Sequence, residues 1–145
     1  MILLKANERA EAGMVPDSQG LAAMAKCNED NVKAGVLLLA EGLKPSSRAS
    51  RVKFSRGKPR VMDGPFAEAK ELLAGFWIIQ VQSLQDAVDW ALRYPFPFRD
   101  TEEVDVEIRP LYEACDFGEA FTPELQQAEE RLRAQVQGAG KGAGQ

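Results

Sequence analysis

Residues 76–92 read FWIIQVQSLQDAVDWAL, and this stretch sets the pattern for the rest of the chain. It begins with β-branched and aromatic residues that predict a strand over Phe76–Gln82. Ser83 is a favoured N-cap residue, and the apolar residues after it recur on one helical face: Leu84, Ala87, Val88, Ala91 and Leu92. Pro95 and Pro97 then end the helix. The stretch predicts a strand followed directly by an amphipathic helix.

The same alternation precedes this stretch. Ile2–Lys5 predicts a strand and Asn7–Pro16 a loop. Asp17 or Ser18 caps a helix that continues to about Ala34, with one stripe made of Leu21, Met24, Ala25, Asn28 and Val32. Gly35 stops this helix. The apolar run Val36–Ala40 predicts a strand that is central and covered on both faces.

A last strand follows over Glu103–Leu111. Its residues alternate strictly, with one side formed by Val104, Val106 and Ile108 and the other by Asp105, Glu107 and Arg109. Two βαβ halves with right-handed crossovers predict an α+β protein. Its sheet is ferredoxin-like, with helices on one face only.

Between the two halves lies an inserted β-hairpin. Arg51–Ser55 and Arg60–Met62 form its strands, with a turn over Ser55–Lys58. Asp63-Gly64-Pro65 interrupts the pattern, and Pro65 is expected to start a short helix over Phe66–Leu73. We expect a domain over residues 1–117, followed by a C-terminal helix and flexible tail over 118–145. The helix is predicted at Glu124–Val136 and docks through a narrow apolar stripe: Leu125, Leu132 and Val136.

The composition excludes several classes of catalytic and metal site. The chain has 145 residues, a formal charge of -4 and no histidine, which excludes Ser-His-Asp triads and His-ligated metal sites within it. Cys27 and Cys115 are its two cysteines, so a disulfide framework is not expected and a thiol nucleophile would lack an imidazole base. We expect a reduced cytoplasmic protein without a membrane span, metal or organic cofactor, and the acidic balance disfavours nucleic acid as a partner.

The strand at Phe76–Val81 is apolar on both faces. Trp77, Ile79 and Val81 lie on one side, and Phe76 and Ile78 lie on the other. Because helices cover only one face of the predicted sheet, something else must cover the second apolar face. Packing against a second copy satisfies this requirement, so we expect a homodimer.

Charged residues share that second face. If the apolar side of the last strand packs under the helices, the side chains of Asp105, Glu107 and Arg109 point to the second face. Strand parity places Lys5 and Glu41 on the same face. One interpretation is a cleft that binds a small ligand. The alternative is an interface network of salt bridges or a solvated rim.

The basic residues of the hairpin and the aromatic residues of the second half have structural interpretations. The hairpin is basic and carries six cations: Arg48, Arg51, Lys53, Arg56, Lys58 and Arg60. Such charges are typical of a solvated edge that resists pairing, and contact with an acidic partner or nucleic acid is the alternative. The aromatic residues of the second half are expected to pack in the core: Trp77, Trp90, Tyr94, Phe96 and Phe98.

Residues 61–71, VMDGPFAEAKE, resemble the DGPF signature of the YCII-related (YciI-like) family. Other segments in order along residues 1–112 resemble the family as well: Glu41-Gly42-Leu43-Lys44-Pro45, Gly75–Ile79, Ser83–Ala87 and Val106–Pro110. The resemblance implies a dimeric α/β barrel made of two ferredoxin-like subunits packed sheet to sheet. It also implies a bacterial source and a regulatory link to extracytoplasmic-function sigma factors. The family's suspected His–Asp pair for lyase- or isomerase-type chemistry cannot be carried over whole, and Asp63 remains as its carboxylate.

Our leading hypothesis is a small anionic ligand in an interface cleft, with Asp63 as general base for proton-transfer chemistry and four binding residues: Glu41, Lys70, Glu107 and Arg109. Whether the protein is an enzyme stays open. In the structural reading, Asp63 caps the short helix, Gly64 allows an unusual backbone angle and Phe66 packs. The competing function is a non-catalytic regulatory or interaction module.

Overall fold

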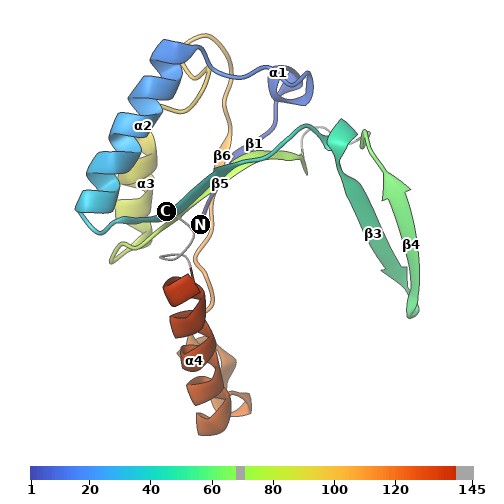
Figure 1. Cartoon of the computed structure of the whole chain (residues 1–145), viewed down its shortest axis with the longest axis vertical. Coiled ribbons are helices and arrows are strands. Elements are labelled where there is room, and N and C mark those ends of the chain that lie inside the picture. Colours follow the sequence, from blue (N-terminus) through green and yellow to red (C-terminus); the bar gives the residue numbers. More distant parts are fainter. Residues whose placement is uncertain (68–70, 140–145) are drawn as a thin grey trace. The chain divides into compact units, whose positions relative to one another are not determined.

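The computed structural model describes residues 1–67 and 71–139 of the chain. Backbone contacts divide it into a first unit, Met1–Pro110, and a second unit that begins at Leu111. The first unit contains β1 (Ile2–Lys5), α1 (Glu8–Glu11), α2 (Ser18–Lys33), β2 (Leu37–Gly42), β3 (Ser50–Ser55), β4 (Lys58–Asp63), β5 (Leu73–Ile79), α3 (Leu84–Arg93) and β6 (Val106–Ile108) (Figure 1). The second contains a 3-10 segment over Ala114–Ala120 and α4 (Pro123–Ala139).

The sheet has the strand order β2-β5-β1-β6, and all of its neighbouring strands are antiparallel. α2 and α3 lie on one side of it (Figure 1). This mixed α+β arrangement is compatible with the predicted ferredoxin-like fold. β3 and β4 form a separate two-stranded sheet, which confirms the predicted hairpin.

The core lies between the sheet and the two helices. It contains eight buried residues: Ile2, Leu4, Leu37, Trp77, Ala87, Trp90, Tyr94 and Phe96. The rings of Trp77 and Tyr94 meet edge to face, with centroids 5.0 Å apart, and Trp90 stacks on Tyr94 at 4.7 Å. The prediction of an aromatic core is confirmed for these residues, whereas Phe98 is only half-buried. Aromatic packing therefore joins the end of α3 and the segment after it to β5.

Helix α2 packs in a way that its apolar pattern does not predict. Asp17 caps the helix as expected, but three residues of the predicted stripe are exposed: Leu21, Ala25 and Val32. The side of α2 toward α3 instead carries Asn28 and Asn31, one helical turn apart. Tyr94 donates its hydroxyl hydrogen to Asn28 Oδ1 (2.7 Å), and Trp90 Nε1 donates to Asn31 Oδ1 (2.8 Å).

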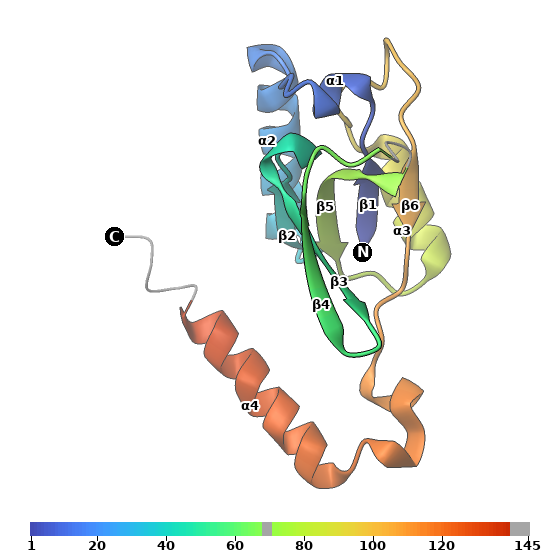
Figure 2. The same ribbon diagram turned by 90° about the vertical axis from the view of Figure 1, so that its right-hand side faces the viewer.

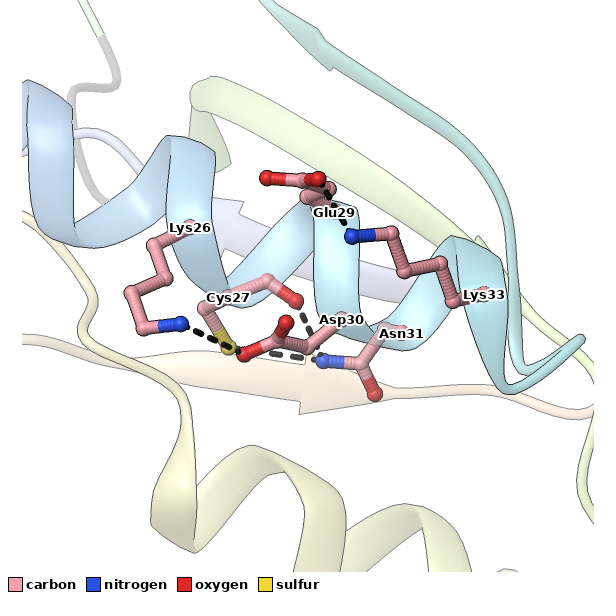
Figure 3. A network of polar contacts seen from close by, with 6 residues as sticks. All are labelled: Lys26, Cys27, Glu29, Asp30, Asn31 and Lys33. Carbon is pink, nitrogen blue, oxygen red and sulfur yellow. Dashed lines mark hydrogen bonds and ion pairs between the residues drawn. The ribbon is translucent and has the colours of Figure 1, made fainter.

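Asn31 is held from its other side as well. Its Nδ2 donates to the carbonyl oxygen of Cys27 (2.7 Å) and to Cys27 Sγ (3.4 Å) (Figure 3). Partial burial, with the nearby Asp30 carboxylate as a second cause, raises the pKa of the Cys27 thiol. Cys27 is therefore a poorly ionised side chain of the helix–helix contact, which agrees with its expected lack of catalytic use.

Three strand and loop predictions need correction. Residues 7–16 are not all loop, because Asn7 caps the short helix α1 by accepting from the Ala10 amide (3.0 Å). β2 is an edge strand and not a central one, and Leu38 and Leu39 on it are exposed. The last strand is confined to Val106–Ile108, since only these residues pair with β1.

The DGPF segment connects the hairpin to the body. Gly64 donates its amide hydrogen to the Ala49 carbonyl (2.9 Å), and a Cβ on Gly64 would lie 1.8 Å from the Ser46 carbonyl oxygen. Gly64 is thus required for close approach and not for a left-handed conformation, because it is not among the residues with positive φ. The Gly64–Pro65 peptide is cis.

The same segment departs from the expected short helix at Phe66–Leu73. Leu73 begins β5, and Phe66 and Ala67 are not helical; residues 68–70 lie outside the described part of the chain. Asp63 therefore does not act as a helix cap; it accepts a hydrogen bond from Ser50 Oγ (2.7 Å) across the base of the hairpin. The Phe66 amide donates to Ser46 Oγ (3.2 Å), and that hydroxyl in turn donates to Glu11 of α1.

In the second unit, α4 confirms the predicted C-terminal helix. Thr122 Oγ1 accepts from the Leu125 amide at the start of α4 (3.4 Å). Tyr112, Phe117 and Phe121 form a ring cluster with centroid separations of 5.4 and 5.5 Å. The docking of α4 through Leu125, Leu132 and Val136 stays a prediction. No helix in the described parts of the chain is long and apolar enough to cross a membrane.

We predict that Gly64→Ala lowers the free energy of unfolding by roughly 2–3 kcal/mol, since the added methyl group must displace backbone and not a flexible side chain. Urea unfolding followed by circular dichroism measures this. Gly42→Ala is the matched control, because no atom lies within 4 Å of a Cβ there. Equal stability of the two variants would contradict the close approach at Gly64.

Candidate functional site

The sheet face away from α2 and α3 carries a row of residues that crosses all four strands. Glu41 of β2 is paired with Phe76 of β5, Phe76 with Leu3 of β1, and Leu3 with Glu107 of β6. Directly paired residues point to the same face, so this open face has an apolar middle and a carboxylate at each edge. Phe76 is only half-buried here, as the pattern of β5 predicts.

At the β6 edge, three charged side chains lie together. Lys5 Nζ lies 2.8 Å from Glu107 Oε2, and Arg109 Nε lies 3.5 Å from Glu107 Oε1. The hydrogen bond and charge of Lys5 hold the pKa of Glu107 below its usual value. The pair therefore persists at pH values at which a free glutamate, of pKa about 4.3, becomes protonated. Strand parity correctly places Lys5, Glu107 and Arg109 together.

The other predicted site residues lie elsewhere. Glu41 is at the opposite edge, three strand spacings or roughly 14 Å from Glu107. Asp63 is at the base of the hairpin and is hydrogen-bonded to Ser50. Lys70 lies outside the described residues. Within one chain, the structure therefore brings Glu107 and Arg109 together but not Glu41 or Asp63.

A cavity of about 500 Å³ lies on the other side of the sheet, toward α2. The sheet contributes Leu4, Ala40, Ala74 and Trp77 to its lining, and α2 contributes Leu21, Met24 and Asn28. The segment between α1 and α2 adds apolar side chains, namely Met14, Val15 and Pro16. Its lining is mostly apolar with a few polar groups, which is the usual character of small-molecule sites.

Asn28 is the polar group that the structure orients at this cavity. Tyr94 occupies its Oδ1, and among the described residues no protein group accepts a hydrogen bond from its Nδ2. Burial raises the pKa of Tyr94, so this hydroxyl remains protonated and a donor at neutral pH. The amide hydrogens of Asn28 are therefore available to an acceptor in the cavity.

Three charged residues also contribute to the lining: Lys5, Glu41 and Lys44. The side chains of Lys5 and Glu41 belong to the open face, and Lys44 forms no ion pair within the described part of the chain. Asn7, by contrast, has a protein partner on each side of its amide, because its Nδ2 donates to Glu102 and its Oδ1 accepts from the Ala10 amide. In residues 1–67 and 71–139, no three cysteine or carboxylate side chains gather closely enough to hold a metal ion.

Sequence reasoning missed the cavity. The sequence predicts a site on the open face because charged residues alternate with apolar ones along the last strand. The cavity depends instead on contacts between elements far apart in the chain. One signal was present: Asn28 interrupts the apolar stripe of α2, and a polar residue at such a position needs a partner.

Comparison with known proteins places the chain in a family. The family model of the YCII-related domain matches residues 1–111. The chain belongs to the YCII-related family. An uncharacterised protein of Rhizobium meliloti (strain 1021) is 40% identical over 85 residues, which cover 55% of this chain and 63% of that protein. The match thus spans less than two thirds of the relative's length, and the second unit of this chain lies outside the YCII-related domain.

We predict that Tyr94→Phe lowers the stability by about 1 kcal/mol, the usual net worth of one hydrogen bond, because Asn28 Oδ1 loses its donor. Tyr112→Phe is the control, since that side chain is 75% exposed. Urea unfolding measures both variants. In the Asn28→Ala background the effect of Tyr94→Phe should largely vanish, and an undiminished effect there would contradict this pairing.

Proposed function

We propose that this YCII-related protein binds a small organic acid with an apolar body in the cavity between α2 and the sheet. The observation that carries the proposal is the Asn28 amide, whose carbonyl side is held by Tyr94 while its N–H side is left for an acceptor. Nothing in the packing of α2 against α3 requires this second donor. It is a pre-oriented polar group in an apolar lining, which is how such sites fix the orientation of a ligand.

The apolar part of the ligand would lie on Trp77, Leu4 and Met24. A cavity of about 500 Å³ falls within the range of small-molecule sites. The proposal retains the class of ligand expected from the sequence, a small organic anion, but moves it from the charged open face to the helix side of the sheet.

The acidic part of the ligand would face the lysines. Lys44 is exposed and lines the cavity, and Lys5 also contributes to the lining, although its ammonium group is paired with Glu107. A carboxylate could therefore accept from Asn28 and pair with Lys44. The proposal is one of binding and not of proton transfer, because Asp63 is hydrogen-bonded within the hairpin and the side chain of Glu41 lies on the open face.

We predict that Asn28→Ala weakens the binding of cinnamate and octanoate about tenfold, the equivalent of one hydrogen bond of 1.4 kcal/mol. Titration calorimetry measures the dissociation constants, with cinnamyl alcohol and octanol as uncharged counterparts. Lys44→Gln should weaken binding of the two acids and leave binding of the two alcohols unchanged.

Asn31→Ala is the matched control, because Asn31 also contacts an aromatic side chain of α3 but does not line the cavity. This variant should lose stability and keep its affinity. Binding that is insensitive to both Asn28 and Lys44, or absent for all four compounds in the wild type, would contradict the proposed site.

We also propose that two copies of the chain pack with their open faces together. Leu39 is 43% exposed on this face, and Leu3, Phe76 and Ile78 are only half-buried beside it. A two-fold axis parallel to the strands would place the β2 edge of each copy over the β6 edge of the other. Glu41 would then lie near Arg109 of the second copy, which makes the two faces complementary in charge.

Ile78→Asp tests this dimer. It would place an unpaired carboxylate between two apolar faces, so we expect monomer or aggregate where the wild type is dimeric. Light scattering after gel filtration gives the mass of each form. Leu84→Asp is the control, since Leu84 is 56% exposed at the start of α3 on the helix side. A monomeric wild type at micromolar concentration would exclude the dimer.

A further inference from the structure

The hairpin formed by β3 and β4 lacks cover on both faces. All of its strand residues except Met62 are exposed. Its two strands pair only with each other. It stands on the side of the sheet opposite α2 and α3, toward the open face (Figures 1 and 2). A two-stranded ribbon of this kind is marginally stable by itself, which indicates that another surface covers it.

The register gives the hairpin two different faces. Val52 is paired with Val61 and Phe54 with Pro59, so these four side chains share one face. Phe54 on this apolar face is 71% exposed. The opposite face is basic and carries Arg51, Lys53, Lys58 and Arg60. A hairpin that serves only as a solvated edge needs no exposed apolar face. The interpretation of this hairpin as a solvated edge is therefore incomplete.

The base of the hairpin is firmly attached. Ser50 and Asp63 are hydrogen-bonded across it, and Gly64 lies against the Ser46 carbonyl. The guanidinium of Arg51 lies over the ring of Phe66, 4.2 Å from its centroid. A pre-oriented ribbon loses little conformational entropy when it meets a partner, which favours a role in docking.

Charge indicates what the hairpin meets. Residues 48–60 contain six lysines and arginines and no carboxylate, in a chain whose net charge is -4. None of the six forms an ion pair within the described residues. Residues 100–107 are the opposite: they contain five carboxylates and no lysine or arginine.

Two of these carboxylates have no partner in the described part of the chain. Glu102 pairs with Arg9, Glu107 with Lys5 and Asp100 with Arg99, whereas Glu103 and Asp105 are exposed and unpaired there. Both precede β6, at the free edge of the sheet. One chain thus carries an unpaired basic arm and an unpaired acidic edge that do not meet each other.

We propose that the hairpin Ser50–Asp63 is an arm that docks on a second copy of this chain, with Lys53 and Arg60 pairing with Glu103 and Asp105 of that copy. Because Phe54 lies on the face opposite Lys53 and Arg60, the second copy contacts both faces of the ribbon. Two-fold symmetry makes each arm contact the other subunit, so every such contact occurs twice. The inference rests on the proposed dimer and assigns it a second contact surface beyond the sheet face.

The test measures the dimer dissociation constant by analytical ultracentrifugation. Lys53 and Arg60 are direct cross-strand partners, so Lys53→Glu with Arg60→Glu keeps a like-charged pair within the hairpin and changes mainly what it presents outward. We expect the dimer dissociation constant of this variant to be at least tenfold higher than that of the wild type. Phe54→Ser should also weaken the dimer. Lys33→Glu with Arg93→Glu, which makes the same change of charge on α2 and α3, should not.

Charge exchange identifies the partner surface. Glu103→Lys with Asp105→Lys should weaken the dimer alone and restore it when combined with the reversed arm. A dimer unaffected by the arm variants would overturn the arm while leaving the sheet-face dimer intact, and a monomeric wild type would overturn both. Weakening without rescue, or arm-dependent binding of a nonspecific DNA duplex by the wild type, would overturn the assignment of the second copy's acidic edge as the partner.

Discussion

The rest of the first unit depends on two hydrogen bonds between helices. Asn28 and Asn31 of α2 accept from Tyr94 and Trp90 of the α3 region, one helical turn apart on each side. A half-buried amide oxygen without a donor is unfavourable by about 1–3 kcal/mol, so only one alignment of the two helices satisfies both residues. Apolar packing alone would tolerate small sliding. The paired amides specify the alignment, and with it the position of the aromatic core over β5.

That alignment has a functional consequence. Tyr94 occupies the carbonyl side of Asn28, and Asn28 lines the cavity, so its N–H side is left without a protein acceptor among the described residues. The cavity and its donor are thus by-products of the contact that holds the helices together. Asn31 has no such spare group, since its Nδ2 is taken by the Cys27 carbonyl. One asparagine of the pair is purely structural, and the other is available to a ligand.

The DGPF segment shows how a recognisable signature can specify geometry. Asp63 joins the two hairpin strands, Gly64 permits contact with the Ser46 carbonyl, and Phe66 supports Arg51. Each position has a steric or hydrogen-bonding reason that requires no substrate. The segment fixes where the hairpin leaves the body, which is what an arm with one apolar and one basic face requires.

The amino-acid sequence by itself determined the succession of the six strands and of α2, α3 and α4, the helix caps at Asp17 and Ser83, and the face shared by Lys5, Glu107 and Arg109. These features follow from local periodicity and from strand parity, which a chain carries along its length. Only the tertiary structure decided that β2 is an edge strand, that Glu41 lies far from Glu107, and that Asp63 belongs to the hairpin. Strand order and close backbone approach depend on contacts between residues distant in sequence, and no local pattern encodes them. The cavity belongs to this second group, because its wall is assembled from α2, the segment before it and three neighbouring strands at once.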